Sequence, residues 1–239
     1  MRVAHIITRL ILGGAQENTL LNCVDLIERY GDDVLLITGP ALGPEGSLLA
    51  KAEAKGVPLE LVDSLRRAIR PGRDWAAYRR IVRILRGFAP DVVHTHSAKG
   101  GILGRAAAWK LGIPAVVHTI HGAPFHPYQN TLGRWFCQEC ERWAERRCHA
   151  ILSVADAMTD LMLRSDIGTP EKYRTIYSGM EVEPFLRARD QRDRVRRELG
   201  YRPEDVVIGK VARFFHLKGH ADVIEAAAAV VRANPNVRF

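Results

Sequence analysis

Seven short apolar runs, each followed by a stretch with helical spacing, constrain the fold of this chain more than any other feature. In the first helical stretch, Leu20, Leu21 and Val24 fall on one helical face. Strands alternating with helices predict a doubly wound α/β domain with a parallel sheet, whose post-strand loops lie at one edge. We expect this Rossmann-like domain to cover residues 1–180. The apolar runs are 3–8, 33–38, 58–62, 91–96, 115–119, 150–154 and 173–177.

The character of the sequence changes after residue 180. Pro184 opens a charged helical stretch that continues to Gly200, Val206–Phe214 begins a new strand, and a helix follows over 221–233. Residues 237–239 then start another apolar run. Because one β-α unit cannot bury both faces of a sheet, we interpret residues 181–239 as a linker and the start of an incomplete second α/β domain. We therefore expect the chain to be truncated.

Composition indicates a globular protein that does not span a membrane. Hydrophobic residues make up 47% of the 239, which is enough for a core. No apolar run approaches the roughly 18–20 residues that cross a bilayer. The N-terminus has a strand pattern where a signal peptide would have its long apolar stretch. These features predict a cytoplasmic protein.

Arginine carries most of the formal net charge of +8. Residues 65–86 contain eight arginines and one acidic residue, Asp74. This pattern fits either a solvated helix face or a patch that meets anionic lipid or a phosphorylated acceptor. No recognition motif or interleaved aromatic platform indicates nucleic-acid binding. The aromatic residues Trp135, Phe136 and Trp143 add a second candidate for peripheral membrane contact, with helix packing as the alternative.

The four cysteines raise the question of a metal site. Cys137, Cys140 and Cys148, with His149 next to the last, have a spacing that invites a zinc interpretation. We expect one helix over 131–148, which cannot fold Cys148 back onto the first pair. The prediction is therefore free cysteines in the core, including Cys23, with no metal and no cofactor.

Two glycine-bearing loops lie where strands lead into helices. Gly13 and Gly14 follow the first strand, can take positive φ, and leave room for a ligand at the helix start, where unpaired amides favour phosphate. An ordinary β-to-α turn is the alternative. A second helix start, near Ser97–Gly101, follows His94 and His96.

A pair of cations marks the start of the second domain. Arg213 and Lys218 lie on the expected loop between a strand and a helix, with Gly219 beside them. Arginine can bind phosphate with two prongs and lysine supplies a point charge, so the pair suits a diphosphate. Two surface cations without a ligand are the alternative.

Five segments in order resemble the N-terminal part of family-four glycosyltransferases of the GT-B fold. They are GGAQENTL at Gly13, DVVHTHSAKGGILGR at Asp91, HTIHG at His118, IYSGMEVEPF at Ile176 and VARFFHLKG at Val211. The resemblance implies a retaining, metal-independent transferase with two facing Rossmann-like domains. It also implies a UDP- or GDP-sugar donor held mainly by the C-terminal domain. The resemblance further implies that the N-terminal domain holds the acceptor, a glycan or a lipid-linked molecule. The process would be cell-surface polysaccharide synthesis.

The same resemblance assigns roles to individual residues. It puts His121, the candidate catalytic residue, and Gly122 beside the transferred sugar. The donor phosphates would lie near Gly13 and Gly14, and the diphosphate would be held by Arg213 and Lys218. Further residues line the cleft: Gln16, where many relatives have Glu, His96, Ser97, Ser178, where many have Asn, and Gly179.

Two alternatives were weighed against a transferase. The family's Glu-x7-Glu segment does not occur before Phe239, which favours a non-catalytic α/β module that binds an acceptor or partner and makes activity of this chain alone uncertain. A dinucleotide-dependent oxidoreductase is excluded because the first loop lacks the Gly-x-Gly-x-x-Gly pattern.

Overall fold

The computed structural model describes residues 1–239, apart from the side chain of His216. Backbone contacts divide the chain into two compact units, Met1–Met180 and Glu181–Phe239. Each unit is described by itself below.

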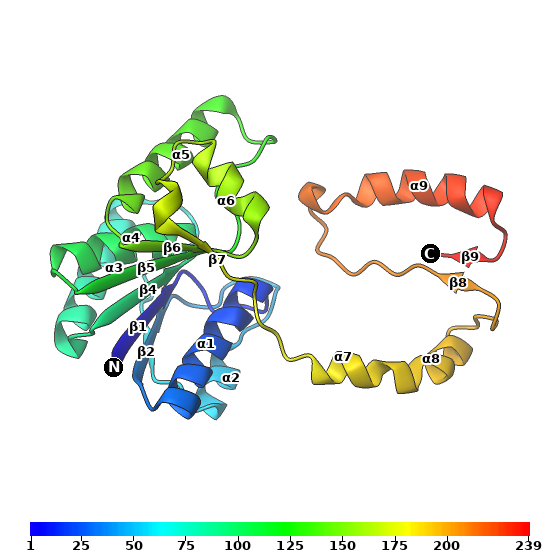
Figure 1. The fold of residues 1–239 in the computed structure, drawn as a ribbon, viewed down its shortest axis with the longest axis horizontal. Helices are drawn as coiled ribbons and strands as arrows, with labels where there is room; N and C mark the ends of the chain where they lie inside the picture. Colours follow the sequence, from blue (N-terminus) through cyan, green and yellow to red (C-terminus); the bar gives the residue numbers. More distant parts are fainter. The chain divides into compact units, whose positions relative to one another are not determined.

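The first unit is built on a seven-stranded sheet in the order β3-β2-β1-β4-β5-β6-β7 (Figure 1). Every neighbouring pair is parallel. This confirms the predicted doubly wound parallel sheet. The strands are β1 (Arg2–Ile7), β2 (Asp33–Thr38), β3 (Leu59–Leu61), β4 (Val92–His96), β5 (Ala115–Ile120), β6 (Ala150–Ser153) and β7 (Tyr173–Thr175).

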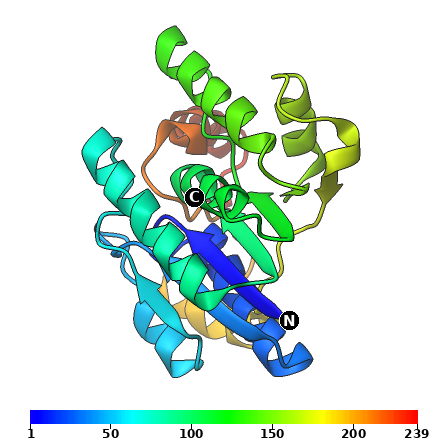
Figure 2. The ribbon, with the colours of Figure 1, turned by 90° about the vertical axis from the view of Figure 1, so that its left-hand side faces the viewer.

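Helices cover both faces of this sheet, and successive strand residues divide between the two cores. Ala4 and Ile6 of β1 belong to one buried cluster, and Val3 and Ile7 belong to the other. Figures 1 and 2 show α1 and α2 on one side of the sheet and the other four helices opposite. The helices are α1 (Gly14–Tyr30), α2 (Leu49–Ala54), α3 (Pro71–Phe88), α4 (Ala98–Lys110), α5 (Thr131–Glu145) and α6 (Asp156–Leu163).

Helix α4 packs very closely against the centre of the sheet. A Cβ at Gly104 would lie 2.7 Å from Cγ2 of Thr95, and a Cβ at Gly100 would lie 2.7 Å from the backbone N of Thr8. Only glycine avoids these clashes. The Gly100 amide also donates a hydrogen bond to Thr8 Oγ1 at 2.8 Å. The start of α4 is therefore fixed against the end of β1.

A buried ion pair joins α4 to α5. Arg105 Nη2 donates to Glu141 Oε2 at 2.7 Å, and both side chains are almost fully buried. The Arg105 Nε group donates to the Gly101 carbonyl at 3.0 Å, so the guanidinium is satisfied on two sides. Sequence analysis did not identify this pair, because its members lie 36 residues apart on helices that look like ordinary surface helices.

Element boundaries differ from the predictions mainly at helix ends and short strands. Helix α5 ends at Glu145, three residues before the predicted end at Cys148. All four cysteines are free, as predicted. Cys23 and Cys148 are buried, whereas Cys137 and Cys140 are only partly buried, so the prediction of core positions was wrong for this pair.

The second unit holds a two-stranded parallel sheet, β8 (Val206–Val207) with β9 (Val237–Arg238). The strand predicted over 206–214 forms only at its first two residues, because backbone pairing is available only where β9 lies alongside. The hydrophobic residues Val211 and Phe214 beyond it are fully exposed. The helical elements are α7 (Glu183–Arg187), α8 (Arg192–Glu198) and α9 (His220–Ala233), with short 3-10 turns at Ala188–Gln191 and His216–Lys218. A further 3-10 turn, Pro170–Lys172, belongs to the first unit.

Candidate functional site

The carboxyl edge of the sheet gathers several of the predicted site residues in the first unit. His96 ends β4 and His121 directly follows β5, and His96 Nδ1 lies 3.1 Å from His121 Nε2. Gly122 next to His121 is exposed. Ser178 and Gly179 follow β7 in an exposed segment without regular structure.

The glycine loop is open, but not for the predicted reason. Gly13 has φ 169°, which is extended backbone, and Gly14 begins α1, so neither residue uses the positive φ that glycine can take. A Cβ at Gly14 would meet no atom within 4 Å. Among the described residues, no side chain caps the start of α1. The Gln16 and Glu17 amides already donate to the Gly13 carbonyl, which leaves the amides of Gly14 and Ala15 for an anion.

Ser97 carries backbone strain at the start of α4. Its φ of 62° and ψ of 165° fall in a region that almost only glycine occupies. Its side chain makes no capping bond to the helix. Strain of this kind persists where neighbouring structure imposes it, and here α4 is already held by Gly100 and Thr8.

A cavity of about 410 Å³ opens beside Ser97 and Gln16, between the ends of β1 and β4 and helices α3, α4 and α5. Two of the six residues predicted to line the cleft, Gln16 and Ser97, belong to its wall, together with the partly buried Cys137 and Cys140. Glu141, the partner of Arg105, lies at the same wall. The buried ion pair thus supports one side of the cavity.

The cavity combines an apolar wall with cations. Hydrophobic lining residues are Ile69, Ile102, Leu103, Pro124 and Phe136. Three cations, Arg9, Arg67 and Lys99, line it as well, and so do two carboxylates, Asp74 and Glu141. Lys99 is fixed by Asp74 at 2.7 Å. Such a wall suits a molecule with an anionic group attached to an apolar chain.

Four histidines converge beside this edge, and the sequence analysis singled out only some of them. His5 lies on β1 opposite His94 of β4, and His5 Nδ1 is 3.0 Å from His96 Nε2. His94 Nε2 lies 2.7 Å from Thr119 Oγ1. The sequence analysis did not identify His5. The sequence does contain a signal for it, because a histidine inside the apolar run of a strand covered on both faces is unusual.

Burial keeps these imidazoles neutral at pH 7. It lowers the pKa of His5 to about 4 and that of His121 to about 4. Burial is also the main reason why the pKa of His96 lies well below its usual range, and the nearby His94 and His5 add to the effect. His121 can therefore donate or accept a hydrogen bond but does not bring a positive charge.

His5, His94 and His96 also form a group that could hold a metal ion, with ligand atoms within 4.8 Å of one another. Three neutral imidazoles are a donor set for ions such as Zn²⁺. His5 Nδ1 and His96 Nε2, however, already lie at hydrogen-bond distance from each other. The arrangement in the structure is a hydrogen-bonded pair.

The predicted diphosphate-binding cations lie in the second unit. Arg213 and Lys218 are both exposed, and Gly219 next to Lys218 has a φ of +60°. Lys210 Nζ donates to the carbonyls of Lys218 and Gly219. The juxtaposition of these cations with Gly13 and Gly14 stays a prediction.

Acid should destabilise the first unit through His5. Above pH 6.5 the unfolded and folded imidazoles are both neutral; as the pH falls toward 4, the unfolded form binds a proton and folded His5 does not. Stability should therefore fall, by about 2 kcal/mol at pH 5 for this residue alone. His5→Asn should show a smaller fall between pH 7 and pH 5 in urea unfolding. Tryptophan fluorescence reports this unit, since all four tryptophans lie in it.

Thr38→Val is the matched control, because Thr38 is equally buried but does not titrate. It should shift stability at both pH values and leave their difference unchanged. An equal fall for His5→Asn and the unmodified chain would contradict the assignment.

Comparison with known proteins identifies the family of this chain. Residues 13–179 match the glycosyl transferase 4-like domain. The chain is 27% identical over 234 residues to the UDP-Gal:α-D-GlcNAc-diphosphoundecaprenol α-1,3-galactosyltransferase of Escherichia coli, covering 98% of this chain and 59% of that protein. It is 29% identical over 174 residues to the α-monoglucosyldiacylglycerol synthase of Acholeplasma laidlawii, covering 67% and 43%.

Among solved structures, HepE of Anabaena in complex with UDP superposes with a TM-score of 0.65 at 17% identity, covering 95% of this chain and 57% of that one. This likeness shows the fold. The chain spans about half the length of the relatives it matches, 43–59%. With most of its first unit matched by the domain, the chain belongs to the glycosyl transferase 4-like family.

Proposed function

We propose that the protein transfers a sugar, with retention, from a UDP-sugar to a sugar carried on a polyprenyl diphosphate lipid, in cell-surface polysaccharide synthesis. The observation that carries the proposal is the cavity at the carboxyl edge. Its apolar wall fits part of a lipid chain, and Arg9, Arg67 and Lys99 fit the diphosphate. The names of the relatives support this: the E. coli enzyme uses UDP-Gal and a diphosphoundecaprenol acceptor, and HepE binds UDP.

In this proposal the site residues divide the work between donor and acceptor. The open start of α1 at Gly13 and Gly14 faces donor phosphate, and Arg213 with Lys218 stabilises the charge that grows on the diphosphate as its bond to the sugar breaks. Neutral His121 hydrogen-bonds a hydroxyl of the transferred sugar and positions it.

Sugar transfer is tested with the full-length protein, labelled UDP-galactose and GlcNAc-diphosphoundecaprenol in detergent, by counting label in the lipid extract. His121→Ala should lower kcat by about tenfold, the value of one lost hydrogen bond. His126→Ala, in the loop that follows, is the control and should change kcat less than twofold. Unchanged turnover of His121→Ala would remove its role.

The alternative is a binding module that recognises the acceptor without transferring a sugar. The same assay separates the two functions. Binding of the lipid acceptor with no label in the extract, under conditions where UDP still binds, would contradict the transferase proposal and support the module.

The cavity cations make a separate prediction about the acceptor. Arg67→Gln should raise the KM for the lipid acceptor by about tenfold, because a charge-assisted bond to the diphosphate is lost, and should leave the KM for the UDP-sugar unchanged. Arg70→Gln, in the same segment but outside the cavity, is the matched control. Equal effects of the two variants would show that the cavity does not hold the diphosphate.

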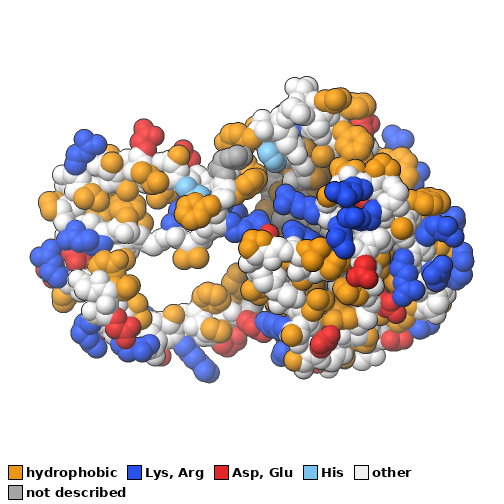
Figure 3. Space-filling view, turned by 180° about the vertical axis from the view of Figure 1, so that it is seen from behind, with side chains coloured by type: hydrophobic (Ala, Val, Ile, Leu, Met, Phe, Trp, Pro, Cys, Tyr) orange, Lys and Arg blue, Asp and Glu red, His pale blue; other side chains and the backbone are white. Residues whose placement is uncertain are grey.

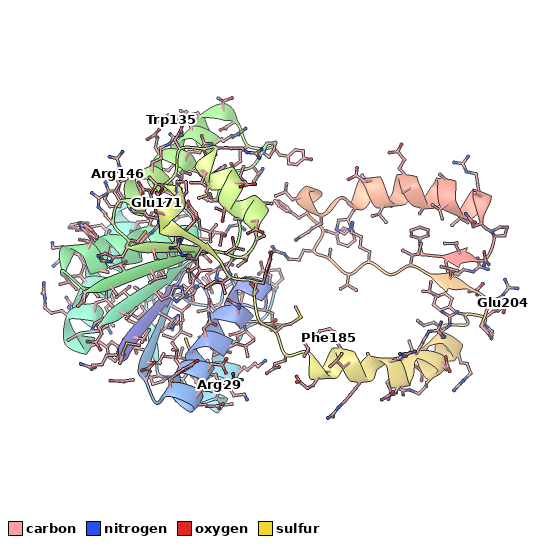
Figure 4. The ribbon with its side chains drawn as sticks, viewed as in Figure 1. Arg29, Trp135, Arg146, Glu171, Phe185 and Glu204 are labelled. Carbon is pink, nitrogen blue, oxygen red and sulfur yellow. The ribbon has the colours of Figure 1, made fainter. Side chains whose placement is uncertain are left out.

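We also propose that the first unit contacts an anionic membrane surface, where such an acceptor resides. Trp75, Trp109, Trp135 and Trp143, on α3, α4 and α5, are all about half exposed or more. Trp75, Trp109 and Trp143 line a hollow of about 540 Å³ together with Lys110 and Arg147. Trp135 lies on the outside of the unit (Figure 4), and Figure 3 shows Lys and Arg side chains spread among hydrophobic ones on its visible face.

Tryptophan beside basic residues is the usual composition of an interfacial contact. No helix among the described residues is long and apolar enough to cross a bilayer.

Vesicle flotation tests this contact. The protein should float with phosphatidylglycerol vesicles and not with phosphatidylcholine vesicles, and 0.5 M salt should release it. Trp75→Ala combined with Trp109→Ala should weaken binding several-fold, whereas Tyr30→Ala, exposed on α1 at the opposite face of the sheet, should not. Equal binding to both vesicle types would contradict the proposal.

A further inference from the structure

Three buried or partly buried imidazoles form an unbranched hydrogen-bonded chain from the centre of the sheet to its carboxyl edge. His5 Nδ1 lies 3.0 Å from His96 Nε2, and His96 Nδ1 lies 3.1 Å from His121 Nε2. Both ring nitrogens of His96 are therefore used. The three residues come from β1, β4 and the end of β5, so three parallel strands hold the chain in place.

Counting protons shows that the three rings are coupled. A neutral imidazole carries one N–H and one lone pair. If His96 donates through Nδ1 to His121, its Nε2 must accept from Nδ1–H of His5. If it donates through Nε2 to His5, its Nδ1 must accept from Nε2–H of His121. All three rings thus carry their proton on Nδ1, or all three carry it on Nε2.

We propose that His5 and His96 are positioning residues that fix the ring orientation of His121 and share one collective tautomer with it. In one state the outer nitrogen of His121, Nδ1, is a hydrogen-bond donor; in the other it is an acceptor. The two states carry the same net charge. They differ by one proton shifted along each hydrogen bond, one removed from His121 Nδ1 and one added at His5 Nε2.

The two ends of the hydrogen-bonded histidine chain differ in their surroundings, and these surroundings decide which tautomer state is favoured. The inner end, His5 Nε2, is buried and has no hydrogen-bond partner among the described residues. His5 and His96 are fully buried, and His121 is only partly so. A proton on His5 Nε2 would be a buried N–H without an acceptor, which costs more than an unpaired lone pair, so the inner end favours the state with all three protons on Nδ1.

His94 lies next to the hydrogen-bonded histidines but takes no part in their hydrogen bonds. The His94 ring packs against that of His96 at a centroid distance of 4.2 Å, but its Nε2 is paired with Thr119. Burial keeps the chain uncharged near neutral pH. If the proposed function holds, His121 Nδ1 therefore donates a hydrogen bond to an oxygen of the transferred sugar.

The test is nitrogen NMR of the protein labelled with ¹⁵N-histidine at pH 7.5. Long-range ¹H–¹⁵N spectra read the tautomer of each ring, and couplings between nitrogens across hydrogen bonds identify the pairs. We expect couplings of His96 to both His5 and His121, and the same tautomer in all three. His149 is the internal reference, because its Nδ1 accepts from the Val116 amide at 2.9 Å and its proton must be on Nε2.

His96→Phe should abolish both couplings and leave His121 as a mixture of tautomers, whereas His149→Phe should leave both couplings intact. Should His96→Phe fail to fold, the couplings of the unmodified chain still decide the matter. Different tautomers among the three rings, or no coupling from His96, would overturn the proposal. The spectra do not depend on catalysis, so coupled rings without sugar transfer would remove the proposed function and leave this inference standing.

Discussion

The parallel pairing of β1 with β4 is the interaction on which the rest of the first unit depends. It joins residues 2–7 to residues 92–96 and lies where the strand order reverses, with β2 and β3 on one side and β5 to β7 on the other. At such a reversal the following helices diverge to opposite faces and leave a crevice at the carboxyl edge. The cavity opens at this place, between the ends of β1 and β4.

Most polar groups that would be costly to bury around this pairing are tolerated because they find a partner close by; His5 Nε2 is an exception among the described residues. The Gly100 amide meets Thr8, Arg105 meets Glu141, and the histidines meet one another or a threonine. Removing one member of such a pair leaves the other buried and unsatisfied, so these contacts specify how α4 and α5 sit on the sheet. The same contacts fix the cavity wall and the orientation of His121.

The surface of the unit is not explained by packing. The tryptophans of α3, α4 and α5 expose large apolar rings to water, which folding alone does not require. Some of them are already paired within the chain, as when the Arg147 guanidinium lies 3.6 Å over the Trp143 ring. The cavity and this surface involve the same three helices, so an acceptor that is part lipid and part diphosphate would meet both.

The sequence by itself determined the class of fold, because apolar runs such as Asp33–Thr38 are short, continuous and separated by helical patterns, and local periodicity is visible without any partner. Its ordered motifs also indicated the family. It could not determine that Gly13 would be extended, that Ser97 would be strained, or that the strand from Val206 would end after two residues, since each depends on a neighbouring segment.

Only the tertiary structure decided which polar residues meet. His5, His96 and His121 are spread over more than a hundred residues of sequence, and their contact exists because β1, β4 and β5 pair in that order. Periodicity describes one segment at a time, whereas a hydrogen bond between strands depends on the register of both.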